Sequence, residues 1–412
     1  MIATMAGFVR STARIALSNR STFSKLLNKQ IPCTQQVAKI SSKAWRELNG
    51  VQRPPPYDYQ NSSYQLRHSW FDKTTKRFDD NSKIILVEGP IAAGKTEFAK
   101  KLANDLDMYY LPQACMDDVY INEYGYDLRD LDVKLPPGAQ SFDEKKFVND
   151  PTNRLTAAFQ LNMYSLKFSD YIDALAHLFS TGQGVVLERS PYSDIVFVEA
   201  LYKCNLITKT TYKGLIETRN NSLPEILKPH LVIYLDVPVN TTLEKIKKRN
   251  LHNEANSPLF KDTKFLETID EVYKRNFLKD ISSHSELLVY DWSNGGDTEL
   301  VVEDIERIDF DSYEKESSKM RDWRFFRVEA DWCEARMKYT EDRHITFSYA
   351  NLPLFHCPDL CIQPEDNMVR NRIYEEAKGS KYAYGYDVEL GDKDILFKTK
   401  HFNSPKSKHW DF

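Results

Sequence analysis

The feature that most constrains this chain is the stretch at residues 89–96, which reads Gly-Pro-Ile-Ala-Ala-Gly-Lys-Thr and fits the pattern G-x-x-x-x-G-K-[ST]. It lies between a short apolar, β-branched run at residues 84–87 and a stretch of helical character from Lys95 to about Asp105. A loop in this position turns backbone N–H groups toward phosphate oxygens, while its lysine reaches the β and γ oxygens and its hydroxyl ligates Mg²⁺. The sequence therefore predicts a phosphate-binding loop, formed by Gly89, Ala92, Ala93, Gly94, Lys95 and Thr96.

Further short apolar runs follow at residues 108–111, 185–187, 231–235 and 287–290, and most are separated by segments of helix length. Strands that are apolar on both faces and alternate with helices are typical of a parallel sheet covered on both sides. We therefore expect an α/β fold of the P-loop NTPase type, with about five parallel strands. The alternation stops near residue 310, so residues 81–309 are predicted to form this domain and residues 310–412 a C-terminal extension.

The N-terminal end differs in charge from the rest of the chain. Residues 1–44 contain seven basic residues and no acidic one, and without them the formal net charge falls from -4 to -11. Basic, Ser-rich and acid-free segments of this kind are typical of mitochondrial transit peptides, which we predict for residues 1–45. A basic arm that binds an acidic partner is the alternative. The run of three prolines at residues 54–56 predicts an extended strap over residues 46–80.

Composition argues against several classes of protein. No stretch approaches the roughly 18 consecutive apolar residues that a membrane-spanning helix needs. The acidic net charge argues against a nucleic-acid partner. Six scattered cysteines do not form a disulfide framework. Cys357 and Cys361 lack the second ligand pair of a zinc site, although His356 lies beside them.

Further motifs follow the loop in a fixed order. They are Phe159-Gln160 at the start of a long helix, Glu188-Arg189-Ser190 after the third strand, and the basic residues Lys245, Lys247, Lys248 and Arg249, with Glu254 after them. Together with the phosphate loop they resemble the deoxynucleoside kinases over about residues 83–291.

This resemblance implies a role for each motif. Gln160 would bind the base of a nucleoside, and Arg189 would lie near its 5′-oxygen. Glu188 would be linked to the metal ion together with Thr96, and the four basic residues would form a lid over the phosphates. The bland alternatives are a structural ion pair for Glu188 and Arg189, a capping or solvent-facing Gln160, and a solvated face for the lysines.

Several residues depart from the kinase pattern. Where kinases carry a glutamate as general base, this chain has Gln113, and an amide cannot accept that proton. Asp117 or Asp118 could substitute, but both are displaced in sequence. Pro90 removes a backbone donor from the loop, and Ala92 restricts φ where a glycine would be free. Lysines also replace arginines in the lid. We therefore expect a site that holds a nucleotide but turns it over poorly.

A second resemblance extends over nearly the whole chain. Residues 181–190, 229–238, 301–306 and 381–393 resemble the accessory subunits of mitochondrial NADH:ubiquinone oxidoreductase, respiratory complex I. It implies a non-redox subunit, peripheral to the inner membrane on the matrix side and held by other complex I subunits. It also implies a bound (deoxy)nucleotide with Mg²⁺, and no flavin, iron-sulfur cluster or haem. An active mitochondrial deoxynucleoside kinase in nucleotide salvage is the alternative.

The C-terminal extension carries aromatic residues interleaved with arginines. These aromatic residues are Trp323, Phe325, Phe326, Trp332 and Tyr339, and the arginines are Arg321, Arg324, Arg327 and Arg336. The aromatic residues could belong to the core. Their mixture with arginine favours a protein interface, because both residue types are enriched there, and RNA binding is the lesser option.

Overall fold

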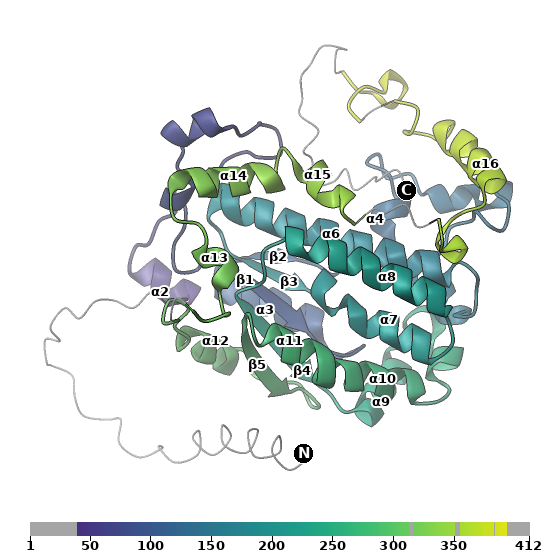
Figure 1. The fold of residues 1–412 in the computed structure, drawn as a ribbon, viewed down its shortest axis with the longest axis horizontal. Coiled ribbons are helices and arrows are strands. Elements are labelled where there is room, and N and C mark those ends of the chain that lie inside the picture. The colour runs from purple at the N-terminus through teal and green to yellow at the C-terminus, as the bar shows by residue number, and fades with distance from the viewer. Residues whose placement is uncertain (1–38, 314–315, 351–354, 383, 394–412) are drawn as a thin grey trace, which may run out of the picture. The chain divides into compact units, whose positions relative to one another are not determined.

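The computed structural model describes residues 39–313, 316–350, 355–382 and 384–393 (Figure 1). Its centre is a five-stranded sheet in the order β2-β3-β1-β4-β5, in which all neighbouring strands are parallel. The strands are β1 (Ile84–Glu88), β2 (Tyr109–Leu111), β3 (Val185–Glu188), β4 (Leu231–Asp236) and β5 (Glu286–Asp291). The predicted α/β fold with about five parallel strands is confirmed, because each strand overlaps one of the apolar runs.

Helices cover both faces of the sheet. The α-helices of the described residues are α2 (Lys43–Leu48), α3 (Lys95–Asp105), α4 (Asp117–Tyr120), α5 (Glu144–Asn149), α6 (Thr156–Thr181), α7 (Asp194–Lys203), α8 (Lys209–Ser222), α9 (Val239–Arg249), α10 (Lys264–Val272), α11 (Leu278–Ile281), α12 (Thr298–Glu306), α13 (Arg321–Arg324), α14 (Glu329–Tyr339), α15 (Arg343–Ser348) and α16 (Pro364–Glu375). Figure 1 shows α6, α7, α8 and α10 on the near side of the sheet and α3 on the far side.

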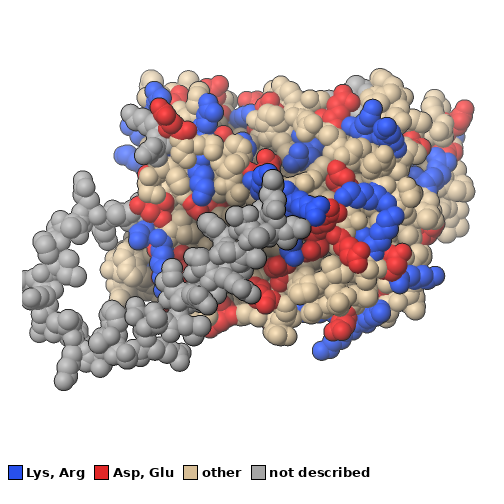
Figure 2. Space-filling view, turned by 60° about the horizontal axis from the view of Figure 1, so that its bottom comes forward, with Lys and Arg blue, Asp and Glu red and all other residues tan. Residues whose placement is uncertain are grey.

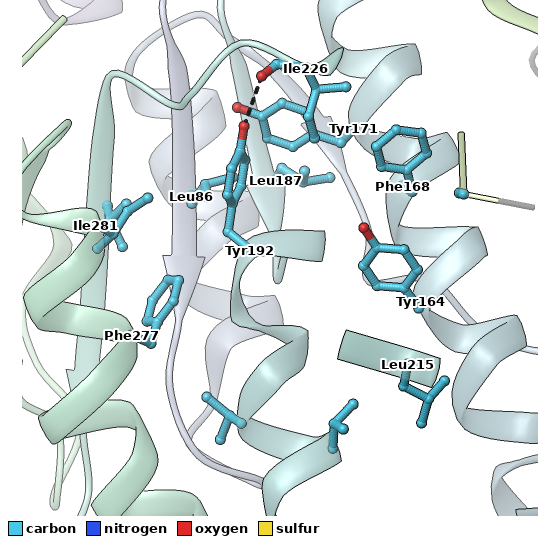
Figure 3. Close-up of a cluster of buried hydrophobic side chains, with 14 of the residues drawn as sticks. Leu86, Tyr164, Phe168, Tyr171, Leu187, Tyr192, Leu215, Ile226, Phe277 and Ile281 are labelled. Atoms are coloured by element: carbon cyan, nitrogen blue, oxygen red, sulfur yellow. Dashed lines mark hydrogen bonds between the residues drawn. The ribbon is translucent and has the colours of Figure 1, made fainter. Parts of the chain in front are cut away.

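The alternation of side chains along the strands divides the core between these two layers. Ile84 and Leu86 of β1 pack with α6, α7, α8 and α10, whereas Ile85 and Val87 pack with α3 and α12. Both layers are apolar, which explains why the central strands β1, β3 and β4 read as continuous apolar runs. Figure 3 shows the first layer, where the buried Tyr192 hydroxyl donates to the Ile226 carbonyl over 3.1 Å.

The C-terminal extension packs against this first layer. The side chains of Trp323, Phe326 and Trp332 contact the core cluster, and Tyr339 is buried within it. The interface interpretation is therefore wrong for the buried Tyr339, whereas the other three residues pack on the long helix α6 with part of their surface exposed, and an interface there stays a prediction. Phe325, by contrast, is 81% exposed.

The predicted strap is only partly extended. Residues 51–58 have no regular structure, but α2 precedes them and the short 3-10 helices η1 (Leu66–Trp70) and η2 (Thr74–Lys76) follow. The strap is fixed to the domain by ion pairs, among them Arg53 Nη1 to Asp107 Oδ2 at 2.8 Å. Of the predicted transit peptide, residues 1–38 lie outside the described residues.

Within the described part of the chain, no helix is both long and apolar enough to cross a membrane. On the face drawn in Figure 2, basic and acidic side chains are interspersed.

Candidate functional site

A cavity of about 630 Å³ opens where the carboxyl ends of β1 and β3 meet the start of α3. Ligands of parallel α/β sheets bind at this edge, because the strand ends and the following loops converge there. The cavity brings together the phosphate loop and the predicted nucleoside residues. It is lined by Ile91, Ala92, Ala93, Gly94, Lys95, Thr96, Gln113, Asp117, Phe159, Gln160, Lys167, Glu188, Arg189, Arg249 and Glu254, among others.

The phosphate loop has the backbone conformation that its glycines permit. Gly94, directly before α3, has a φ of 87°. A Cβ on Gly89 would lie 2.7 Å from the Leu235 carbonyl oxygen, so only glycine fits between β1 and β4. Ala92 has a φ of 57°, in the left-handed region that costs a residue with a Cβ roughly 1 kcal/mol. The restriction expected at Ala92 is therefore present as strain in the loop.

Lys95 lies inside this loop rather than in solvent. Its side chain is buried, and Nζ donates to the Pro90 carbonyl oxygen over 2.7 Å. Burial lowers the pKa of Lys95 well below its usual value, and the nearby positive charge of Arg189 lowers it further, while Glu188 and Glu88 act in the opposite direction. An anion in the loop would offset this desolvation by pairing with the ammonium group.

Thr96 and Glu188, the predicted metal residues, lie next to each other. The Thr96 hydroxyl donates to Oε2 of Glu188 over 3.0 Å, and the Tyr110 hydroxyl donates to Oε1 over 2.5 Å. A threonine hydroxyl and a carboxylate are hard oxygen donors of the kind Mg²⁺ prefers, so this pair fits the ion. Tyr110 was not predicted, because it lies in the second strand with no motif around it.

Arg189 occupies the centre of a second cluster beside the loop. It has a φ of 59° and lies directly after β3. Its Nε donates to Oε1 of Gln113 over 3.1 Å, and its Nη1 donates to the Tyr273 hydroxyl over 2.8 Å. Tyr273 in turn donates to the fully buried Glu88 over 3.1 Å, and burial raises the pKa of Glu88. Sequence reasoning missed Tyr273 and Glu88. The latter directly precedes the loop and could have been noticed there.

Gln160 belongs to a buried polar group at the far side of the cavity. Its Nε2 lies 3.1 and 3.0 Å from the two carboxylate oxygens of Asp194, and Lys167 Nζ lies 2.6 Å from Oδ1. Gln160 is 5% exposed, so it neither faces solvent nor caps the helix. Lys167 and Asp194 were missed. Lys167 lies two turns after Gln160 on α6, and Asp194 lies four residues after Ser190. These spacings gave only a weak indication that both residues belong to the site.

The four predicted lid residues do not act together in this structure. Lys247 and Lys248 are exposed on α9, and Lys245 Nζ donates to the Trp292 carbonyl over 3.0 Å. Of the four, only Arg249 is among the residues that line the cavity, where Nε donates to Oε2 of Glu254 over 3.1 Å.

The two aspartates considered as substitute bases are separated as well. Asp117 lines the cavity, and its Oδ1 lies 2.7 Å from Nη1 of Arg129. Asp118 is not among the lining residues. The described residues contain no group of three His, Cys, Asp or Glu side chains arranged to hold a metal ion.

The sequence profile of the family "Deoxynucleoside kinase" matches residues 85–324, which is more than half of the chain. The chain belongs to the deoxynucleoside kinase family. Within its described part, this match covers the sheet, the phosphate loop and every predicted site residue. The resemblance to deoxynucleoside kinases is thereby confirmed, together with the fold that it implied.

Individual relatives extend the similarity beyond the kinase domain. The chain is 36% identical to NADH dehydrogenase (ubiquinone) 1 alpha subcomplex subunit 10, mitochondrial, of Mus musculus, over 79% of its own length and 87% of that protein. Its identity to the Bos taurus protein of the same name is 32%, over 79% of this chain and 90% of the relative. A deoxyguanosine kinase of Dictyostelium discoideum is 29% identical over 58% of this chain and 73% of that enzyme. The second resemblance, to complex I subunits, is therefore confirmed.

Proposed function

We propose that this member of the deoxynucleoside kinase family is a non-catalytic accessory subunit of mitochondrial respiratory complex I, required for assembly or stability of the complex. The names and coverage of the mouse and cattle relatives support this assignment. The proposal places the protein at the matrix face of the inner membrane, peripheral and held by other complex I subunits. It includes no nucleic-acid partner and no flavin, iron-sulfur cluster or haem.

The observation that carries the non-catalytic part is the environment of Gln113. This amide lines the cavity beside Arg189, where the family resemblance places the base that accepts the 5′-hydroxyl proton. A neutral amide oxygen that already accepts a hydrogen bond from a guanidinium group has no capacity to take up a proton at neutral pH.

We further propose that the cavity retains a (deoxy)nucleotide with Mg²⁺. The loop N–H groups and Lys95 would hold the phosphates, and Thr96 and Glu188 would hold the ion, which neutralises phosphate charge when bound. Gln160, fixed by Asp194, would bind the base, and Arg189 the ribose end of the nucleoside. Of the predicted lid residues, Arg249 would contact the phosphates, because it lines the cavity.

An active mitochondrial deoxynucleoside kinase is the second candidate. Asp117 favours it, because this carboxylate lines the same cavity and could accept a proton if it parted from Arg129. The similarity to a Dictyostelium discoideum deoxyguanosine kinase agrees with this candidate.

Native sizing of membrane extracts distinguishes the two candidates. An accessory subunit should migrate with a very large assembly that also oxidises NADH, and little of it should be free. A salvage kinase should migrate at the mass of the chain or a small oligomer and carry magnesium-dependent phosphorylation of a deoxynucleoside. Finding all of the protein in the small fraction would overturn the proposal.

A further inference from the structure

At η1 the strap presents a group of three large apolar side chains to solvent. Leu66, Trp70 and Phe71 are 57%, 80% and 93% exposed. They lie on η1 and the residue that follows it, and we call these three residues the strap tip. Figure 1 shows this segment beside α14, at the purple end of the described chain. Exposed apolar residues gathered on one short element mark an interaction site rather than an ordinary surface.

The backbone around the strap tip is held firmly by α14 and the residues after it. The Tyr64 N–H donates to Oε1 of Glu341 over 2.9 Å, and the Thr74 N–H donates to Oε1 of Glu329 over 2.6 Å. Ser69, between the tip residues, is itself buried. The tip side chains are therefore exposed because the fold points them outward, and not because the segment is loosely attached.

Within residues 65–76 the exposed charges have one sign, although the fold also brings the carboxylates of Glu329 and Glu341 against this segment. The exposed charged residues between positions 65 and 76 are Arg67, Lys73 and Lys76, in a chain whose formal net charge is -4. The acidic residue of this segment, Asp72, is mostly buried and forms ion pairs with Arg77 at 2.7 Å and Arg336 at 3.1 Å. The tip therefore combines apolar side chains with a basic rim, formed by Arg67, Lys73 and Lys76. No exposed acidic residue lies between these three in the sequence.

We propose that the strap tip docks into the headgroup region of an anionic lipid bilayer. Trp70, Phe71 and Leu66 would enter the boundary between headgroups and acyl chains, where Trp and other amphipathic or apolar side chains are favoured. Arg67, Lys73 and Lys76 would contact lipid phosphates. The basic rim decides between a protein groove and a membrane as the partner. An apolar groove on a protein would need only the three apolar residues, whereas the rim favours a negatively charged surface. The inference rests on the proposed location at the inner membrane.

The test uses purified full-length protein and vesicles of phosphatidylcholine with about one third phosphatidylglycerol, prepared with and without brominated acyl chains. Bromine quenches tryptophan that enters the bilayer. This readout is local, because the basic residues 1–38 contain no tryptophan and their binding to vesicles would not be seen. We expect quenching with wild type and its loss in Trp70→Phe. Trp45→Phe is the matched control, since Trp45 is also exposed but lies on α2, outside the tip.

The role of the rim is tested by charge removal. Lys73→Gln/Lys76→Gln should weaken vesicle affinity about fivefold for each lysine, and phosphatidylcholine alone should bind weakly. Lys209→Gln/Lys213→Gln removes two exposed lysines from α8 and should leave the affinity unchanged. A thermal melt of each variant verifies that it is folded.

Quenching that persists in Trp70→Phe, or equal affinity for neutral and anionic vesicles, would overturn the proposal. A further pair of results would also overturn it: no quenching with wild type, together with failure of the double variant Trp70→Ser/Phe71→Ser to join the large assembly. The tip would then contact protein and not lipid. Failure of vesicle binding leaves the role in complex I standing, since native sizing tests that role separately.

Discussion

The side chain of Arg189 donates a hydrogen bond from Nε to Oε1 of Gln113 over 3.1 Å, at the carboxyl end of the strand next to the phosphate loop. The two residues are 76 positions apart in the sequence. The contact holds an amide by a charged donor, at the position that the proposed function assigns to the base of the family's kinases.

Gln113→Glu should yield at most a trace of phosphoryl transfer. A carboxylate restores the chemical group, and general-base catalysis is typically worth about 10²- to 10⁴-fold in rate. However, Pro90 still lacks an N–H, Ala92 remains strained at φ 57°, and Arg249 is the only predicted lid residue at the cavity. The assay uses radiolabelled ATP, Mg²⁺ and each of the four deoxynucleosides. Wild type should give no product above background.

Robust turnover by wild type would contradict this account, provided Arg189→Ala abolishes it and so excludes a contaminating kinase. The base would then lie elsewhere in the cavity. Asp117→Asn is the variant to examine next, because this carboxylate lines the cavity.

Lys95→Ala should weaken nucleotide retention by about 10- to 100-fold. Removing one charged donor to a phosphate typically costs about 1.5–3 kcal/mol. Saturating nucleotide should therefore raise the melting temperature less in the variant than in wild type. Lys101→Ala, on the exposed face of the same helix, is the matched control. Equal nucleotide content and equal ligand-induced stabilisation in Lys95→Ala and wild type would show that the loop does not bind phosphate.

Arg336→Met should destabilise the protein and release the strap. The guanidinium of Arg336 is fully buried, lies 3.6 Å from the ring centroid of Tyr64, and pairs with Asp72 at 3.1 Å. Breaking a buried ion pair typically costs about 3–5 kcal/mol, but Asp72 keeps its pair with Arg77 at 2.7 Å, so we expect a smaller loss of about 2–3 kcal/mol in the free energy of unfolding. Urea denaturation measures the loss, and limited trypsin digestion at residues 46–80 reports the strap. Arg327→Met, at an exposed position, should change neither.

How much of this molecule the sequence predicts depends on how local each feature is. The sheet was predictable because its central strands β1, β3 and β4 are buried on both faces, and the phosphate loop because its residues are contiguous. Tyr110 and Glu188 are 78 residues apart and Gln160 and Asp194 are 34 apart, so packing alone brings these pairs together.

The lysine cluster on α9 illustrates the opposite error. Composition identified a basic helix, but not the direction of its side chains, and the structure leaves Lys247 and Lys248 in solvent. Among the aromatic residues of the extension, the buried Tyr339 was misread for a related reason. Arginine between them suggested an interface, yet Arg336 itself is buried against the strap.

His177 makes the stability depend on pH. Burial lowers its pKa to about 4, from an ordinary value near 6.5. The unfolded chain therefore binds more protons between these values, and the stability that is present above pH 6.5 decreases as the pH falls toward 4. From pH 7.5 to 5.5 we expect a loss of about 1 kcal/mol that His177→Gln does not show. Urea denaturation at both pH values measures it, and an identical pH dependence in the two proteins would refute the assignment.

The central claim is that the chain supports complex I without catalysis of its own. The most direct measurement is the amount and NADH-to-quinone activity of assembled complex I after depletion of this chain, with re-expression of wild type or Arg189→Ala. We predict that depletion lowers both, that wild type restores both, and that Arg189→Ala restores them to the extent that it accumulates as folded protein. Normal assembly and full activity without the chain would contradict the claim. A second result would also contradict it. This result is that wild type phosphorylates a deoxynucleoside, while Arg189→Ala protein is folded and joins complex I but does not restore its amount and activity.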